Sequence, residues 1–161
     1  MAVDAFITFE SVAAGAVPQA FEIKDFSFGV ENPTTIGSAT SGAGAGKVKF
    51  NEFTIKKTSD QSSPAFFKNC CAGAHYKSVT VSMRSTSGEV AGKEFLRFKF
   101  DTVFTTKIDW SGPGDEGPEE SITFVYGKLG IRFTPAPGSK PVAAAGWDQV
   151  TNKAADDFAA G

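Results

Sequence analysis

The sequence has a single histidine, His75, and only two cysteines, Cys70 and Cys71, which are adjacent. Adjacent cysteines can bridge only through a strained ring, so we expect reduced thiols rather than a disulfide framework. Neighbouring side chains on a helix diverge by roughly 100°, which makes this pair a poor grip for a tetrahedral ion. We therefore expect no metal, no cofactor and no catalytic site built on histidine or cysteine.

An excess of positive charge is also missing, because sixteen Lys and Arg stand against eighteen Asp and Glu. Nucleic-acid and anionic-membrane binding normally need such an excess. No stretch approaches the roughly 20 apolar residues of a membrane-spanning helix, and residues 1–6 lack the basic and apolar regions of a secretory signal. We expect no nucleic-acid partner, no membrane insertion, synthesis in the cytoplasm and secretion by a signal-peptide-independent route.

Two motifs resemble catalytic signatures but lack the context that the chemistry needs. The glycine-rich segment Gly42–Lys47 precedes a predicted strand, whereas a phosphate loop needs a helix N-terminus. The acidic cluster Asp115–Glu120 lies in a Pro/Gly-rich loop, whereas glycoside hydrolysis needs two rigidly held carboxylates. We interpret this cluster, and likewise Lys56–Lys57, as solvated charge, and an enzyme is the least favoured class.

Phenylalanine is abundant, with sixteen residues, and most of them alternate with polar residues as in half-buried strands. In the runs Phe21–Val30, Val48–Ile55 and Ile122–Phe133 the apolar positions shift phase by one residue partway along. A strand with a side-chain period of two keeps facing one core only if a bulge or bend absorbs that shift. Three such strands favour a strongly curved or closed sheet over a flat one.

One short helix is predicted from Ser63 to Gly73. Ser63 can cap it, Pro64 suits the first helical position, and Gly73 can end it. Phe66, Phe67 and the two cysteines are expected on one face. Further alternating strands are predicted around residues 79–83 and 96–100, which read as part of a meander.

The stretch Glu31–Gly46 is rich in Gly, Ala, Ser and Thr and is predicted to be a long exposed loop. Loops of more than about 12 residues without regular structure are usually functional or disordered. We take it as a candidate contact arm, with a linker of no particular role as the alternative. The candidate ring or stacking contact residues are Glu31, Asn32, Thr34, Thr35, Ile36, Gly42, Gly44 and Gly46.

Proline, alanine, glycine and mixed charges dominate after Pro135. We therefore predict one β-domain over residues 1–134, followed by an irregular C-terminal tail over residues 135–161. Trp147 is the residue that could pin this tail to the domain.

Several segments form an ordered combination that spans nearly the whole chain. They are Phe6–Val12, Ile23–Val30, Gly46–Val48, Phe53–Asp60 with Ser63–Pro64, Phe66–Gly73 before His75, Pro118–Ile122, and Gly146–Asp148 with Asn152–Lys153. In order and spacing they resemble the Hcp family (haemolysin-coregulated protein), the tube protein of the type VI secretion system.

The resemblance implies a mainly β fold, with two antiparallel sheets closing into a β-barrel-like core and one short flanking helix. It also implies a homo-hexameric ring, a secreted phage tail-like tube built from stacked rings, and a lumen in which effectors can be chaperoned. The implied partners are the spike protein, the sheath subunits and effector proteins. The loop Glu31–Gly46 would then reach across a ring or ring-stacking interface.

Two other functions fit the same residues. A phage-type tail-tube protein shares the ring but not the secretion role, and a monomeric ligand-binding β-barrel would use its loops as a mouth. The native mass separates the ring-forming proteins from the monomer.

Overall fold

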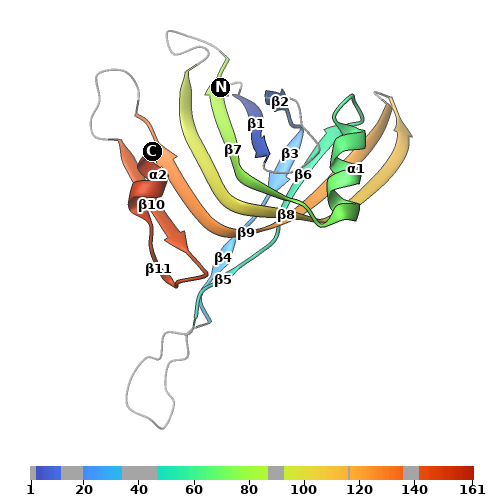
Figure 1. The fold of residues 1–161 in the computed structure, drawn as a ribbon. Helices are drawn as coiled ribbons and strands as arrows, with labels where there is room; N and C mark the ends of the chain where they lie inside the picture. The colour runs from blue at the N-terminus through green and yellow to red at the C-terminus, as the bar shows by residue number, and fades with distance from the viewer. Residues whose placement is uncertain (1–2, 12–19, 34–46, 87–92, 116, 136–141) are drawn as a thin grey trace.

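The computed structural model describes residues 3–11, 20–33, 47–86, 93–115, 117–135 and 142–161 (Figure 1). Within these ranges the elements are β1 (Val3–Ser11), β2 (Ala20–Glu22), β3 (Asp25–Ser27), β4 (Val30–Glu31), β5 (Lys49–Phe50), β6 (Phe53–Thr58), α1 (Ser63–Ala72), β7 (His75–Ser85), β8 (Glu94–Gly114), β9 (Gly117–Phe133), β10 (Ala143–Asp148), β11 (Lys153–Ala154) and α2 (Asp156–Ala160). Neither helix in these ranges is long and apolar enough to cross a membrane. The fold is mainly β, as predicted.

Most strands belong to one antiparallel sheet in the order β11-β10-β9-β8-β7-β1-β2, to which β6 and β3 are added through β9. The strands β8 and β9 are 21 and 17 residues long and curve strongly along the sheet (Figure 1). The first half of β9 pairs with β6, and its second half pairs with β10. β9 is therefore shared by two regions of the molecule.

The first predicted phase shift coincides with a corner of the chain. β2 pairs with β1 and ends at Glu22, and β3 begins at Asp25 and pairs with β6. Between them Ile23 N donates to Ala5 O at 3.0 Å, and Lys24 N donates to Lys56 O at 2.9 Å. The shift therefore marks the place where the chain passes from β1 to β6, which confirms the predicted bend.

The other two shifts also coincide with irregular backbone. Asn51 and Glu52 separate β5 from β6. Within β9 the buried positions change phase around Gly127, which lies beside Thr102 of β8, a residue with a φ of 54°. The irregular backbone at these two positions absorbs the shift of one residue, so the apolar side chains on both sides of it face the same side of the curved sheet.

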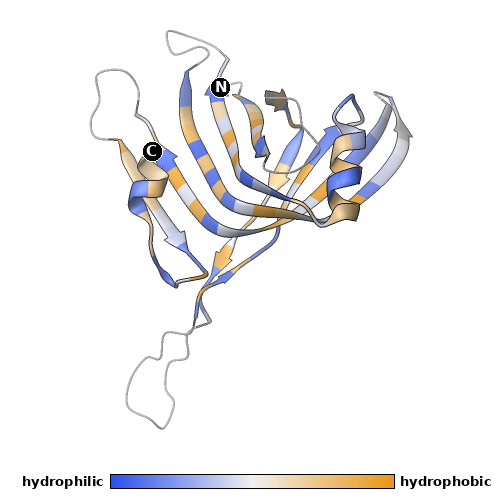
Figure 2. Ribbon diagram, in the orientation of Figure 1, coloured by the Kyte–Doolittle hydropathy of each residue, from blue (hydrophilic) through white to orange (hydrophobic). Residues whose placement is uncertain are grey.

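The core is dominated by aromatic side chains. Phe53 and Phe100 stack with ring centroids 4.4 Å apart, and Phe124 packs against Phe53, Phe9 and other rings. The alternation that predicted these strands is visible as alternating apolar and polar bands along β8 and β9 (Figure 2). The buried cluster is Ile7, Phe9, Ile23, Phe53, Ile55, Phe66, Tyr76, Val79, Val81, Phe100, Val103, Ile122, Phe124, Tyr126 and Leu129.

Helix α1 lies where it was predicted, with proline in its first turn and Gly73 at its C-terminus. Gly73 has a φ of 67°, a left-handed conformation that glycine adopts without strain. Its N-cap is Ser62 rather than Ser63, and only Phe66 and Asn69 are buried. Phe67 and Cys71 are exposed, so the predicted common face is split between the core and the surface.

The C-terminal segment differs from the predicted irregular tail. β10 pairs with β9 from Lys128 to Phe133, and α2 packs over the same two strands. A Cβ added to Gly130 would meet Ala159 at 2.8 Å, so the absence of a side chain there lets α2 approach closely. The alanine-rich run of β10 has no alternating pattern, which is why its pairing was not predicted.

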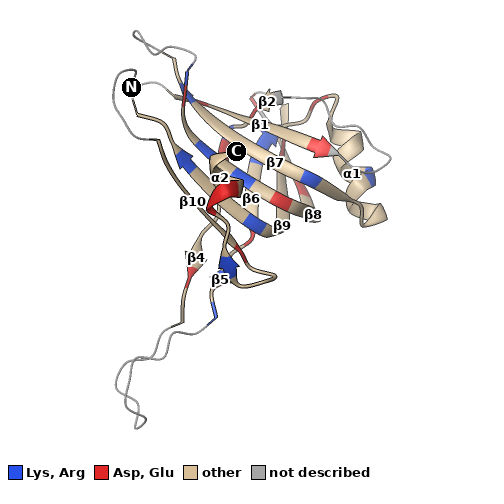
Figure 3. Cartoon of the chain, turned by 60° about the vertical axis from the view of Figure 1, so that its left-hand side comes forward, with Lys and Arg blue, Asp and Glu red and all other residues tan. Residues whose placement is uncertain are grey.

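Positive charge on the sheet helps to hold α2. The side chain of Phe158 lies under two ammonium groups, with Lys99 Nζ 4.6 Å and Lys128 Nζ 5.0 Å from its ring centroid. Figure 3 shows the acidic α2 beside basic positions of β8 and β9. Cation–π contacts of this kind contribute about 0.5–1 kcal/mol each at exposed sites.

The predicted closure of two sheets into a barrel is not found in the described residues. Their strands form one nine-stranded sheet and a separate two-stranded hairpin, β4–β5, and there are two helices rather than one. β2 and β3 have three residues each and are interrupted at Ile23 and Lys24, so no continuous ladder joins β1 to β6. The fold is an antiparallel, mainly β arrangement without a closed barrel.

Candidate interaction surface

The predicted contact arm leaves the sheet on the short hairpin β4–β5. Val30 pairs with Phe50 and Glu31 with Lys49, and Lys49 Nζ lies 3.6 Å from Glu31 Oε1. Among the predicted contact residues, Glu31 lies in this stem and Asn32 directly follows it. Thr34, Thr35, Ile36, Gly42, Gly44 and Gly46 lie outside the described residues.

The stem is fixed to the core by a buried tyrosine. Tyr126 of β9 donates its hydroxyl hydrogen to Asn51 O at 2.9 Å, and its ring packs against Phe50 with centroids 5.8 Å apart. Burial raises the pKa of Tyr126 to about 12, so its hydroxyl stays protonated and keeps donating at physiological pH. The foot of the arm is therefore held to the centre of β9.

An apolar hollow of about 400 Å³ opens at the foot of the arm. In β9 and β10 the pairs Ile131–Ala145 and Leu129–Trp147 place four apolar side chains on one face. The arm stem closes the other side. The full lining is Val30, Asn32, Val48, Phe50, Leu129, Ile131, Ala145, Gly146 and Trp147.

A second apolar patch lies at the other end of β8 and β9, beside α1. Phe67 of α1 and Trp110 of β8 are 53% and 50% exposed, and their ring centroids are 6.3 Å apart. We call this pair the aromatic patch. Figure 1 shows α1 and β10 at opposite ends of the curved sheet.

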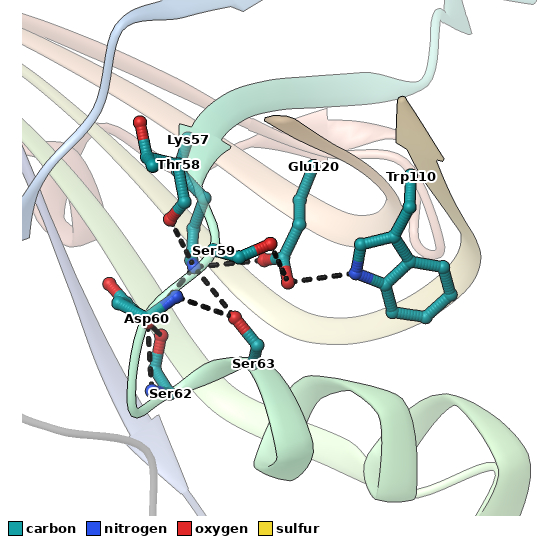
Figure 4. A network of polar contacts seen from close by, with 8 residues as sticks. All are labelled: Lys57, Thr58, Ser59, Asp60, Ser62, Ser63, Trp110 and Glu120. Carbon is teal, nitrogen blue, oxygen red and sulfur yellow. Dashed lines mark hydrogen bonds and ion pairs between the residues drawn. The ribbon is translucent and has the colours of Figure 1, made fainter. Parts of the chain in front are cut away.

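A buried ion pair lies directly behind the aromatic patch. Lys57 of β6 and Glu120 of β9 are 2% and 1% exposed, and Lys57 Nζ lies 2.9 Å from Glu120 Oε2. Lys57 also donates to Asp60 Oδ1, Ser63 Oγ and Thr58 O (Figure 4). A buried ammonium needs such partners, because an unpaired buried charge is strongly destabilising.

The same network orients the indole of the aromatic patch. Trp110 Nε1 donates to Glu120 Oε1 at 2.9 Å, and Ser59 donates to the same oxygen (Figure 4). Burial alone would raise the pKa of Glu120, but hydrogen bonds from Ser63, Lys57 and Trp110 outweigh it and lower that pKa. Glu120 is therefore ionised at neutral pH and holds an exposed indole in one orientation.

The interpretation of these charges as solvated was wrong for Lys57 and Glu120. The signal was present in the sequence, because Lys57 continues the buried period of Phe53 and Ile55, and Glu120 precedes Ile122 and Phe124 in the same phase. A lysine and a glutamate on inward positions of two strands indicate an ion pair if the strands are neighbours. That neighbourhood, between β6 and β9, is not apparent from the sequence.

The remaining candidate groups do not form a catalytic or metal site in the part of the chain that the structure describes. His75 packs beside Phe104 with ring centroids 5.3 Å apart. Cys70 and Cys71 are free thiols. No group of three or more metal-ligating side chains is found within those ranges. The features of the described surface are therefore the apolar hollow and the aromatic patch, and the buried pair of Lys57 and Glu120 orients the latter.

Comparison with known proteins gives one family match and several similar structures. A family model described as "Type VI secretion system effector, Hcp" matches residues 7–133. The solved structure of a type six secretion system protein is similar, with 22% identity and a TM-score of 0.81 over 96% of this chain and 100% of that one. Hcp1 from Salmonella typhimurium is similar, with 19% identity and a TM-score of 0.73 over the same shares.

A phage-derived structure is also similar. The cap that terminates the tube of the anti-feeding prophage has 11% identity and a TM-score of 0.58 over 81% of this chain and 88% of that chain. No curated protein sequence matches the chain. At these identities the structural matches establish the fold, and the family model adds the family.

Proposed function

The chain belongs to the Hcp family of the type VI secretion system, and from this premise we propose that it is the ring subunit whose stacked hexamers form the secreted inner tube. Proteins of this family are structural tube proteins rather than enzymes, are secreted by the system and assemble as hexamers. The family match over residues 7–133 carries the proposal. The exposed apolar hollow and aromatic patch support it, because a ring subunit must bury surface against its neighbours.

We further infer that the segment from β2 to β3 links β1 and β6 without closing a barrel. Its first part, β2, pairs with β1, and after the break at Ile23 and Lys24 its second part, β3, pairs with β6. In a ring this segment would stiffen each subunit without adding a strand between them.

The specific partners of the tube follow from the same premise. A tube in this system would contact a spike protein at its tip and sheath subunits along its outside, and its lumen would hold small effectors. Export inside this machinery would need no signal peptide.

The proposed role of the arm is to contact the next ring of the tube. Its stem is rigidly attached to β9 through Tyr126 and points away from the sheet (Figure 1). The contact residues would include Glu31, Asn32, Thr34, Thr35, Ile36, Gly42, Gly44 and Gly46.

Native mass tests the ring. Size-exclusion chromatography with multi-angle light scattering is expected to give about six times the 16.9 kDa mass of one chain. Electron micrographs of the same fraction should show rings with an open centre. A stable monomer at high micromolar concentration would contradict the ring and favour a ligand-binding protein.

Deletion of residues 34–46 tests the arm. In a strain that relies on this copy for secretion, we expect the shortened protein to form hexamers but to be absent from the culture medium. Normal secretion of the shortened hexamer would contradict a stacking role for the arm.

A further inference from the structure

The ring described above requires a contact between unlike surfaces. A closed ring of identical subunits is built head to tail, so each subunit must carry two different and complementary surfaces. Neither surface can be identified from the family match alone. Among the exposed apolar features of the described residues, the hollow and the aromatic patch lie far apart (Figure 1).

Resting on the proposed ring, we propose that the aromatic patch of one subunit inserts into the apolar hollow of the next. The two surfaces lie toward opposite ends of β9: Trp110 pairs with Glu120, and the hollow is lined by Leu129 and Ile131, which lie roughly 30–36 Å further along an extended strand. Opposite placement is what a ring contact needs, because the two neighbours of a subunit approach from different sides.

The aromatic patch has the properties of an interface anchor. Tryptophan is enriched among residues that dominate binding energy, especially where it is held rigidly and fills a pocket on the partner. Trp110 is half-exposed, yet its indole nitrogen is fixed by Glu120, which Lys57 holds in turn. The buried ion pair thus holds the indole of Trp110 in one orientation before binding, so less side-chain conformational entropy is lost when a partner binds.

The hollow has the properties of the receiving surface. Its volume of about 400 Å³ is sufficient for aromatic side chains, and among the described lining residues only Asn32 and the indole N–H of Trp147 supply side-chain hydrogen-bonding groups. A small-molecule site normally has several placed polar groups that fix the ligand's orientation. The hollow also adjoins the arm stem, so a subunit bound in the hollow would lie next to the arm.

Glutamate substitutions test the contact, because a charge placed in a buried apolar interface is costly. We expect Phe67→Glu and Ile131→Glu to convert the hexamer into a monomer by light scattering. Val125→Glu is the matched control: Val125 is 38% exposed in β9, close to the 40% of Ile131, and belongs to neither surface. This control is expected to remain a hexamer, and cooperative thermal unfolding of all three verifies that they fold.

Mixing the two monomeric variants distinguishes a head-to-tail pairing from other geometries. Phe67→Glu retains an intact hollow, and Ile131→Glu retains an intact aromatic patch. One intact contact can therefore form between them, so the mixture is expected to give a heterodimer and no larger ring. A mixture that stays monomeric would overturn this pairing of surfaces.

The outcomes also separate this proposal from the ring itself. If the unmodified protein is a monomer, the ring fails before the contact is tested. If it is a hexamer and both Phe67→Glu and Ile131→Glu are hexamers too, the ring stands and the proposed contact is wrong. Loss of the hexamer in Val125→Glu, with the hexamer retained in the other two, would place the contact elsewhere on β9.

Discussion

The two halves of β9 show how one strand can serve two purposes. From Glu120 to Tyr126 its inward side chains are covered by β6, α1 and the aromatic core, and they are buried. Beyond the phase change at Gly127, Leu129 remains buried, but Ile131 and Phe133 are 40% and 47% exposed although they alternate in the same way. The apolar pattern is equally strong in both halves.

Alternation therefore indicates which face of a strand avoids water, but not whether the same chain or another molecule covers that face. In the first half the cover comes from the same chain. In the second half β10 extends the sheet sideways, and α2 covers the opposite face through Ala159 and Phe158. We therefore expect substitutions in the first half to reduce the stability of the subunit, and substitutions in the second half to act mainly on assembly.

The largest loss is expected for Phe124→Ala, in the first half of β9. Its ring is fully buried and contacts Phe9, Phe53, Phe66 and Tyr76. Removing such a ring costs about 3–5 kcal/mol, because the cavity closes only partly. Urea denaturation at equal protein concentrations checks this, and a loss below 1 kcal/mol would show that the first half is not the core.

A comparable loss is expected for Glu120→Ala, because it leaves the buried ammonium of Lys57 without its main partner. Breaking a buried pair in this way costs about 3–5 kcal/mol. The double variant Glu120→Ala with Lys57→Met removes both charges and should recover part of the loss. No recovery in the double variant would mean that Glu120 stabilises the fold by another route.

The same pair makes stability depend on pH. The folded protein lowers the pKa of Glu120, so its contribution is complete above the ordinary glutamate value of about 4.3 and is lost as pH falls through the lowered pKa. Asp60, beside Lys57 and Ser62, also has a lowered pKa and shifts stability in the same direction. The free energy of unfolding, measured by denaturation at several pH values, should decrease less between pH 7 and pH 3 for Glu120→Gln than for the unmodified protein. An equal decrease in both proteins would show that Glu120 is not the source of the pH dependence.

A smaller loss is expected for Gly130→Ala, in the second half of β9. The new Cβ would lie 2.8 Å from Ala159, so α2 must shift away from the sheet. Overpacking of this kind costs about 1–3 kcal/mol. Loss of hydrogen-exchange protection confined to residues 155–161 would show that the second half of β9 holds α2 without supporting the core. Loss of protection in β6 would show instead that both halves of β9 support the same core.

The smallest effect is expected for Glu119→Ala, next to the buried Glu120. Glu119 points to the opposite side of β9 and is only partly buried. A substitution away from the core and from charge networks usually changes stability by no more than about 0.5 kcal/mol. A loss as large as that of Glu120→Ala would mean that the two carboxylates have been assigned to the wrong faces.

Local features of the fold were predictable because they depend on neighbours in sequence. The helix between Pro64 and Gly73 and the bends near Asp25, Asn51 and Gly127 were identified from residue chemistry and phase alone. The Pro/Gly-rich loop predicted around Asp115–Glu120 is shorter than expected, because β8 continues to Gly114 and β9 begins at Gly117. The pairing of β8 with β9 in a hairpin keeps residues extended whose individual strand propensity is low.

Features that depend on distant partners were not predictable in the same way. β10 is strand only because it pairs with β9, and α2 is held by Gly130 and by lysines of β8 and β9. The ion pair between Lys57 and Glu120 joins strands whose adjacency no local pattern reveals. For the candidate site, the arm was recognised from composition, whereas the hollow required Trp147 and Ile131 to be brought together by the sheet.

The unbroken course of β8 and β9 has a mechanical consequence. The two strands run from the aromatic patch to the hollow, so a push or pull received at one of these proposed subunit contacts would pass to the other along the strands. The hydrogen bonds between antiparallel strands lie perpendicular to that direction, so they are loaded together in shear rather than opened one after another. In a ring, such strand pairs would bear tension around the circumference and so resist separation of the subunits while the tube is driven forward.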